Sequence, residues 1–327
     1  MLCMIDVNNI FSVGPQNLEE IALTTFRFQY ENNGLYRIWC DRLGRTPASV
    51  RYVEDIPALP VSFYKSDRVV TTEFESEVIF RSSGTTGTTG SFHHVKDVGM
   101  YRESYSRGFR RMYGEPADWC ILGLLPSYLE RGDSSLVNMV QGLLQQSGHV
   151  LGGFFLQDWE ELAGRLGKLE AEGQKALLIG VTYALLDFAE RHPMELRHTV
   201  VMETGGMKGR REELTRSEVH DRLKLAFGLG EVHSEYGMTE LLSQAYSKGG
   251  GRFVCPPWMR VLVRDERDPL AVMKEGEGVL QVVDLANCYS CSFIATEDVG
   301  CVYGDGSFEV WGRQDDADLR GCSLLAV

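Results

Sequence analysis

Basic residues are in deficit in this 327-residue chain. The 33 Lys and Arg residues face 46 Asp and Glu residues, which gives a formal net charge of −13 and a pI near 5.1. Contacts with nucleic acid or with an anionic membrane surface require a basic face, so this balance argues against either as the main partner. An anionic substrate would have to be met by local positive charge.

Long apolar runs and closely spaced cysteines are also absent. The longest apolar stretch, residues 176–189, is too short and too interrupted to span a bilayer. Asp6 interrupts a weakly apolar N-terminus, so we expect no secretory signal peptide. The eight cysteines are scattered, which predicts reduced thiols and a cytoplasmic location. They are Cys3, Cys40, Cys120, Cys255, Cys288, Cys291, Cys301 and Cys322.

A loop rich in hydroxyls and glycine is the most informative stretch. The apolar residues 78–80 end at a segment with six Ser and Thr hydroxyls between Ser82 and Thr89, and with glycines at 84, 87 and 90. Glycine lets backbone N–H groups approach a ligand closely, so the loop suits a polyphosphate. A solvated linker has a similar composition. No Gly-Lys-Ser/Thr ending is present and the next lysine is Lys96, which disfavours a Walker-type nucleotide-binding loop.

Apolar runs then alternate with amphipathic segments. We expect strands at 120–125, 148–155, 176–181 and 199–202, and helices at 97–113, 136–146, from 158, at 182–192 and at 210–227. This alternation predicts an α/β fold with parallel strands and helices on both faces. The predicted organisation is a helical preface at 1–77, an α/β nucleotide-binding core at 78–260, a β-rich subdomain at 261–312, and a hinge with a short tail at 313–327.

Two further stretches carry groups that suit a nucleotide. Residues 236–240 read Tyr-Gly-Met-Thr-Glu, which supplies a ring for stacking on a base, a hydroxyl for a phosphate and a carboxylate for Mg²⁺. Gly205 and Gly206 follow a predicted strand and would let a flat ring lie against the backbone, although a tight turn explains them equally well. His93 and His94 follow the loop, where adjacent histidines are more often solvated than catalytic.

A zinc site is the weaker alternative for the cysteines. Cys288 and Cys291 form one Cys-x-x-Cys pair, and Cys255, Cys301 and His233 are the other candidate ligands. No second pair exists, whereas structural zinc usually needs four well-spaced ligands.

Four motifs occur in the order seen in adenylate-forming enzymes, the acyl-CoA synthetase and adenylation-domain superfamily. They lie at 82–90, 236–240, 296–300 and 312–316. The chain resembles this superfamily over about residues 78–321. The resemblance implies a multilayer α/β large domain with two mostly parallel sheets and a smaller β-rich subdomain, with ATP and Mg²⁺ as cofactors. It also implies roles for single residues. Ser83, Gly84, Thr85, Thr86, Gly87 and Thr88 would hold phosphates, and Gly205 and Gly206 would border the adenine. Tyr236 would stack on the adenine, and Gly237 would be a further cofactor-binding residue. Thr239 would contact the α-phosphate, Glu240 would ligate Mg²⁺, Asp298 and Arg313 would bind the ribose, and Asp315 would be the hinge.

The chain departs from the superfamily near its end. Members normally continue into a small domain carrying a lysine that stabilises the attack on ATP, and we expect this domain to be missing or vestigial, with another cation in its place. Arg320 is a weak candidate. The short chain with Cys322 beside its hinge looks like the acyl-protein synthetases of bacterial luciferase fatty-acid reductase complexes, as do residues 125–131.

This second resemblance implies that a hydrophobic fatty or aryl acid is activated to acyl-AMP and passed to a thiol, with Cys322, Glu240 and Thr239 as catalytic residues. An acyl reductase, an acyltransferase or a carrier protein is the implied protein partner. Cys322 could instead be a small packing residue. Two alternatives remain open: an acyl-CoA or acyl-carrier ligase, and a nucleotide-binding scaffold without catalysis.

Overall fold

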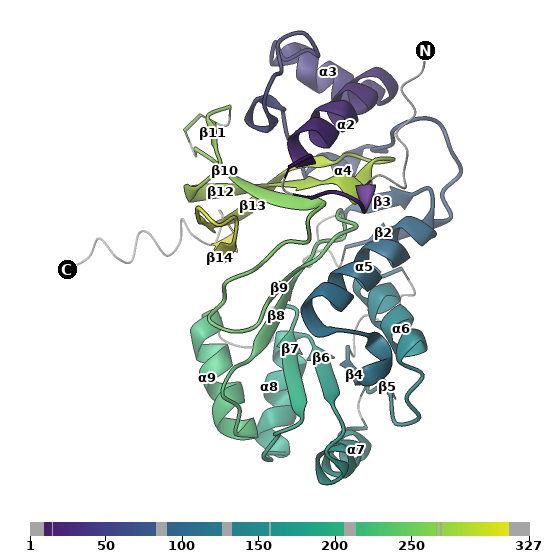
Figure 1. Cartoon of the computed structure of the whole chain (residues 1–327), viewed down its shortest axis with the longest axis vertical. Coiled ribbons are helices and arrows are strands. Elements are labelled where there is room, and N and C mark those ends of the chain that lie inside the picture. Colours follow the sequence, from purple (N-terminus) through teal and green to yellow (C-terminus); the bar gives the residue numbers. More distant parts are fainter. Residues whose placement is uncertain are drawn as a thin grey trace, which may run out of the picture.

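A mostly parallel sheet forms the lower half of the molecule in Figure 1. The computed structural model describes residues 10–14, 16–82, 90–125, 133–156, 158–205, 214–265, 267–268 and 270–313. The strand order is β5 (Gly153–Phe154), β4 (Cys120–Leu124), β6 (Ala176–Gly180), β7 (Thr199–Glu203), β8 (His233–Tyr236) and β9 (Ala245–Ser247). The pairs from β5 to β8 are parallel and β9 runs antiparallel. The strands β4 and β6 are buried throughout, as expected for strands covered on both faces.

Helices cover both faces of this sheet because consecutive strand residues point to opposite sides. His233 on β8 contacts the Tyr113 hydroxyl of α5 (Val98–Tyr113), whereas Ser234 contacts His220 of α9 (Arg216–Phe227). The other helices are α6 (Ser135–Ser147), α7 (Trp159–Glu172) and α8 (Thr182–Arg191).

The helix ends follow local capping rules. The Asp158 side chain accepts a hydrogen bond from the Glu161 amide at the start of α7, and Gly173 ends that helix in the left-handed conformation. Thr215 and Glu218 form a capping box at the start of α9. The expected strand at 148–155 is reduced to β5, because Gly148 ends α6 in a left-handed conformation and residues 149–152 form a turn.

A second large sheet lies above the first in Figure 1. Its order is β1 (Leu59–Pro60), β13 (Phe293–Val302), β12 (Gly276–Asp284), β10 (Met259–Arg264) and β11 (Val272–Met273), and β14 (Phe308–Arg313) also pairs with β13. Apart from the parallel β1–β13 pair, its pairings are antiparallel. The predicted α/β class is therefore confirmed, but the expectation of two mostly parallel sheets is wrong, because short turns join these strands and such turns connect antiparallel neighbours. A separate hairpin joins β2 (Val78–Arg81) to β3 (Phe92–Val95).

The N-terminal helices pack on the second sheet. They are α2 (Leu18–Asn32), α3 (Gly34–Arg42) and α4 (Phe63–Ser66), and short 3₁₀ turns lie at η1 (Val53–Asp55), η2 (Pro116–Asp118) and η3 (Leu285–Asn287). The buried Gln29 side chain donates to the Cys288 carbonyl oxygen at 2.9 Å, and the Asn33 side chain donates to the Ser290 carbonyl oxygen at 3.2 Å. Residues far apart in sequence are thus held together around η3. No helix of the described residues is long and apolar enough to cross a membrane.

Candidate functional site

Three strands bring predicted nucleotide-binding residues together where the two sheets meet. Tyr236 ends β8, Asp298 lies on β13, and Arg313 ends β14 directly opposite Asp298. The Tyr236 hydroxyl donates a hydrogen bond to Asp298 Oδ2 at 2.8 Å, and Arg313 Nε lies 3.8 Å from Asp298 Oδ1. Because Tyr236 lies at the carboxyl end of a parallel strand, the cluster occupies the edge where ligands of open α/β sheets collect.

Burial sets the protonation of this cluster. Burial, followed by the Asp298 charge, raises the pKa of Tyr236 well above its usual range, so the phenol stays protonated and can donate. Burial also raises the pKa of Asp298, against the opposing effects of the Tyr236 hydrogen bond and the Arg313 charge. The Tyr236 ring packs against Phe308 and Phe253, with ring centroids 5.3 and 5.9 Å away. Stacking of Tyr236 on an adenine stays a prediction.

Thr239 and Glu240 lie in the turn after β8, and two buried side chains hold their backbone. His93 Nδ1 lies 2.8 Å from the Thr239 carbonyl oxygen, and Asn287 Nδ2 donates to the Glu240 carbonyl oxygen at 2.7 Å. His93 Nε2 lies 3.0 Å from Asn287 Oδ1, so the two side chains also contact each other. The turn is therefore attached both to β3, which follows the hydroxyl-rich loop, and to η3.

The Glu240 side chain faces the end of that loop. Burial raises the pKa of Glu240, and a hydrogen bond from the Ser91 side chain and the charges of Arg313 and Lys65 work in the opposite direction. The loop ends are joined because the Ser91 amide donates to Ser82 Oγ at 2.8 Å and the Ser82 amide donates to the Ser91 carbonyl oxygen at 3.1 Å. The Glu240 carboxylate therefore lies beside Ser91, at the described end of the loop.

His93 differs from the sequence-based expectation of a solvated histidine. Its side chain is buried, and its ring lies edge-on to Tyr64 with centroids 5.7 Å apart. Burial lowers the pKa of His93 to about 4, against the hydrogen bonds to Thr239 and Asn287. His93 therefore acts as a neutral hydrogen-bonding group inside the protein.

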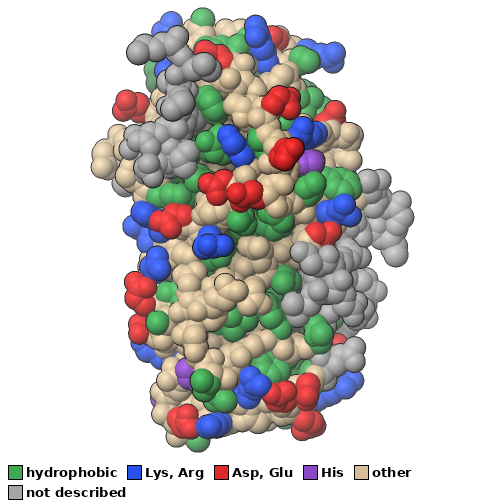
Figure 2. Space-filling model, turned by 90° about the vertical axis from the view of Figure 1, so that its right-hand side faces the viewer, with side chains coloured by type: hydrophobic (Ala, Val, Ile, Leu, Met, Phe, Trp, Pro, Cys, Tyr) green, Lys and Arg blue, Asp and Glu red, His purple; other side chains and the backbone are tan. Residues whose placement is uncertain are grey.

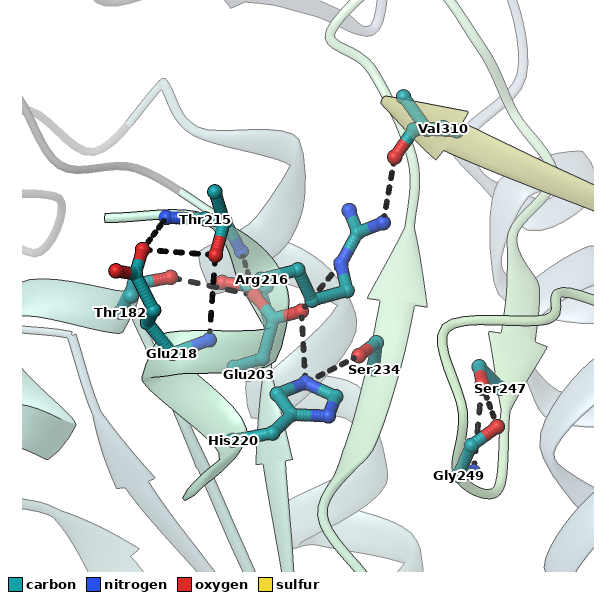
Figure 3. Close-up of polar contacts among 12 residues, drawn as sticks. Thr182, Glu203, Thr215, Arg216, Glu218, His220, Ser234, Ser247, Gly249 and Val310 are labelled. Carbon is teal, nitrogen blue, oxygen red and sulfur yellow. Dashed lines mark hydrogen bonds and ion pairs between the residues drawn. The ribbon is translucent and has the colours of Figure 1, made fainter. Parts of the chain in front are cut away.

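A second polar cluster surrounds Glu203, at the carboxyl end of β7 (Figure 3). Its Oε2 accepts hydrogen bonds from the Gly205 amide at 2.7 Å and from Thr182 Oγ1 at 3.2 Å, and its Oε1 lies 3.2 Å from Arg216 Nε. Burial alone would raise the pKa of Glu203, but His220 and Arg216 overcome this effect and hold it at about 2. Glu203 is thus a buried, ionised and fully paired carboxylate.

Arg216 connects this cluster to the second sheet. Its Nη1 donates to the Val310 carbonyl oxygen on β14 at 2.8 Å, and its guanidinium lies 5.1 Å from the Phe253 ring centroid (Figure 3). Its charge also lowers the pKa of Asp298. The sequence did not point to Arg216 or Glu203, although a carboxylate two residues before Gly205 was a usable signal.

The remaining predicted residues divide into two groups. Gly205 has a left-handed φ of 73°, which favours glycine, and Gly237 is exposed on the surface beside Tyr236. The others lie outside the described residues. They are Ser83, Gly84, Thr85, Thr86, Gly87, Thr88, Gly206, Asp315, Arg320 and Cys322.

Glu240 stays the predicted ligand for Mg²⁺. In the described part of the chain, no group of three or more His, Cys, Asp or Glu side chains is placed to hold a metal ion, so no zinc site is found there. Mg²⁺ is usually held by one or two carboxylates together with substrate phosphates, rather than by an all-protein cage. A single buried carboxylate beside Ser91, at the end of the hydroxyl-rich loop, fits that mode of binding.

Solved structures of other proteins are similar in fold to this chain. The chain is similar to MatB from Rhodopseudomonas palustris, solved with ATP bound, with a TM-score of 0.53 and 18% identity over 86% of this chain and 57% of that one. It is equally similar to an ATP-bound RpMatB-BxBclM chimera, with a TM-score of 0.53 and 17% identity over 86% and 56% of the two chains. The fold is that of the adenylate-forming enzymes. The chain spans little more than half the length of these solved adenylate-forming structures.

A curated protein extends the likeness at the sequence level. The chain is 24% identical over 325 residues to the long-chain-fatty-acid–luciferin-component ligase of Vibrio harveyi, a match that covers 91% of this chain and 84% of that protein. No family model matches the chain. The predicted resemblance to adenylate-forming enzymes, and to this ligase among them, is confirmed.

Proposed function

We propose that the protein activates a hydrophobic carboxylic acid, fatty or aryl, with ATP to form acyl-AMP, and passes the acyl group to a cysteine thiol, that of its own Cys322. The observation that carries the proposal is the cluster of Tyr236, Asp298 and Arg313 beside the Glu240 turn, at the carboxyl ends of parallel strands. The similarity to a ligase named for long-chain fatty acids supports the substrate class.

The described residues suit the handling of a nucleotide. Asp298 offers carboxylate oxygens to the ribose hydroxyls, and the Arg313 charge favours the ionised form of that carboxylate against the effect of burial. Tyr236 orients Asp298 through its hydroxyl, which burial keeps protonated. The Glu203 carboxylate fixes the Gly205 amide, so the backbone that would border the adenine is rigid.

The turn at Thr239 and Glu240 would act on the reacting phosphate. Glu240 would hold Mg²⁺, which neutralises phosphate charge and so favours attack at the α-phosphorus. His93 and Asn287 fix both backbone carbonyls of this turn and thus position the Thr239 hydroxyl and the Glu240 carboxylate. The acid's carboxylate attacks, pyrophosphate leaves, and a thiolate then displaces AMP. A reducing cytoplasm would keep that thiol available.

Acyl transfer gives a direct test. The protein is incubated with MgATP and a radiolabelled long-chain fatty acid, the acyl-AMP is measured by mass spectrometry, and protein-bound label is measured after gel electrophoresis. We expect acyl-AMP, together with label that neutral hydroxylamine removes, as for a thioester. Cys322→Ser should abolish the label and leave acyl-AMP formation intact, whereas Cys301→Ser, at a half-buried cysteine on β13, serves as the matched control.

Other outcomes identify the alternatives. Protein label that survives in Cys322→Ser would contradict the role of Cys322. Free thioester that appears only when coenzyme A or a carrier protein is added would favour the acyl-CoA or acyl-carrier ligase. ATP binding without acyl-AMP from any acid would refute the enzyme and favour a scaffold subunit that serves an acyl reductase or acyltransferase.

A further inference from the structure

The short helix α4 lies beside β3, close to where the two sheets meet (Figure 1). It follows β1, which pairs in parallel with Ile294 and Ala295 of β13, and the Val61 amide donates to the Ala295 carbonyl oxygen at 3.0 Å. The same β13 strand continues to Asp298. The strand that carries the ribose candidate therefore also anchors the start of α4.

Tyr64 holds α4 against Ser290 and His93. Its side chain is fully buried, its hydroxyl lies 3.0 Å from Ser290 Oγ, and its ring lies edge-on to His93 with centroids 5.7 Å apart. Because His93 Nδ1 is 2.8 Å from the Thr239 carbonyl oxygen, one side chain separates Tyr64 from the turn that carries Thr239 and Glu240. The position of α4 relative to this turn is thus well determined.

Lys65 follows Tyr64 and carries an exposed ammonium group. Its charge and that of Arg313 both act on the nearby Glu240 carboxylate. Among the described residues, Lys65 has no ion-pair partner and no aromatic ring beneath its ammonium group. Within the described part of the chain, its ammonium group is therefore available to an anion from solution.

The neighbouring cations already have partners. Arg313 lies 3.8 Å from Asp298, Arg216 lies 3.2 Å from Glu203, and Lys96 sits 4.0 Å from the Tyr289 ring centroid. In an acidic chain with a net charge of −13, an anionic substrate must be met by local charge. On the face drawn in Figure 2, the coloured basic and acidic side chains are interspersed, so that face offers no broad basic surface to replace a single well-placed lysine.

We propose that Lys65 binds an anionic group of the substrates beside Glu240, either a phosphate of ATP or the carboxylate of the acid. This inference rests on the proposed function. The two sources share one chemistry, an oxyanion that meets an ammonium on a flexible four-carbon stem. Lys65 thereby supplies positive charge at a site whose hydroxyl-rich loop contains no lysine.

Two substitutions of Lys65 and one of a distant lysine test the proposal. Lys65→Met removes the charge and keeps most of the stem, and Lys65→Arg keeps the charge. Lys168→Met is the matched control, because Lys168 is exposed on α7 and its ammonium lies 4.0 Å from Glu172 in the same helix. The KM values for ATP and for a long-chain fatty acid are measured separately, and the binding of each substrate alone is measured by calorimetry.

We expect Lys65→Met to raise one of the two KM values by about tenfold or more, because a charge-assisted contact is lost. Lys65→Arg should return that KM most of the way to the wild-type value, and Lys168→Met should have wild-type KM values. A rise in the KM for ATP identifies a phosphate, and a rise in the KM for the acid identifies the carboxylate. Unchanged KM values and affinities for both substrates in Lys65→Met would overturn the proposal. If the wild type forms no acyl-AMP, the proposed function fails, but calorimetry still tests the role of Lys65. Weaker binding of ATP or of the fatty acid by Lys65→Met than by the wild type supports that role. Equal binding by the two proteins overturns it.

Discussion

Glu235 provides a sharp test of the electrostatics behind the Tyr236 strand. Its side chain projects from β8 toward α5, on the opposite face from Tyr236, and is partly buried. A Cβ at Gly237 would collide with its carboxyl group, so glycine there makes room for Glu235. Burial, followed by the Glu203 charge, raises the pKa of Glu235 from 4.5 to about 8. The folded protein therefore holds this carboxyl in its neutral form at pH 7.

The sign of the pH dependence follows from proton binding. Between pH 4.5 and about 8 the folded chain binds a proton at Glu235 that the unfolded chain has released, so the free energy of unfolding falls as the pH rises through this window. Each pH unit in this window lowers the free energy of unfolding by about 1.4 kcal/mol. The contribution of Glu235 to that free energy therefore falls by about 2 kcal/mol between roughly pH 6 and pH 7.5. The glutamine side chain of Glu235→Gln is neutral at every pH, so this variant does not lose that stability as the pH rises.

Urea unfolding at both pH values measures the effect. We expect Glu235→Gln to gain about 2 kcal/mol relative to the wild type between roughly pH 6 and pH 7.5. Titration of the buried His93 and the half-buried His233 occurs in both proteins and cancels in the difference. The exposed Glu277 supplies the control variant Glu277→Gln, which should follow the wild type. An equal difference between Glu235→Gln and the wild type at the two pH values would refute the reasoning, because it would mean that the folded protein does not hold Glu235 neutral.

Three further predictions concern the site. Asp298→Asn should raise the KM for ATP by about tenfold in steady-state kinetics, since it removes the charge that Arg313 pairs with, and an unchanged KM would argue against ribose binding there. His93→Gln should lower kcat and raise the Mg²⁺ concentration needed for half-maximal activity, because the hydrogen bond to the Thr239 carbonyl oxygen is lost. His94→Gln, the control, should change neither value. Equal effects of the two variants would contradict a positioning role for His93. Arg216→Met should lower the free energy of unfolding by about 2 kcal/mol in urea titrations, since it leaves the buried Glu203 carboxylate short of a partner, and an unchanged value would show that the pair does not stabilise the fold.

Local signals in the sequence predicted much of the first sheet. The helix α7 follows from its Asp158 cap and from buried leucines at 162, 166 and 169, and the uninterrupted apolar runs at β4 and β6 identify buried strands. The second sheet was predicted only as a β-rich segment at 261–312, which contains most residues of β10 to β14, whereas β1 lies outside it. Its antiparallel pairing was missed because strand direction depends on which partners meet and not on any one strand's own pattern.

The contacts that assemble the site could not be predicted, because they join distant residues. His93 meets Thr239 across 146 positions and Asn287 across 194, and Arg216 reaches Val310 across 94. No periodicity or motif near His93 marks it as buried, since its environment is formed by Tyr64, the Thr239 turn and η3. The motif residues Tyr236, Glu240 and Asp298 were found because their residue types and order match the adenylate-forming enzymes.

The exchange of labelled pyrophosphate into ATP tests the central claim most directly, because it reports formation of the mixed anhydride with AMP and needs no acyl acceptor. With Mg²⁺ present, we predict exchange that depends on a hydrophobic acid, is strongest for fatty or aryl carboxylates over amino acids, and persists in Cys322→Ser. Exchange with no acid from a broad panel, in a protein that binds ATP, would contradict the account.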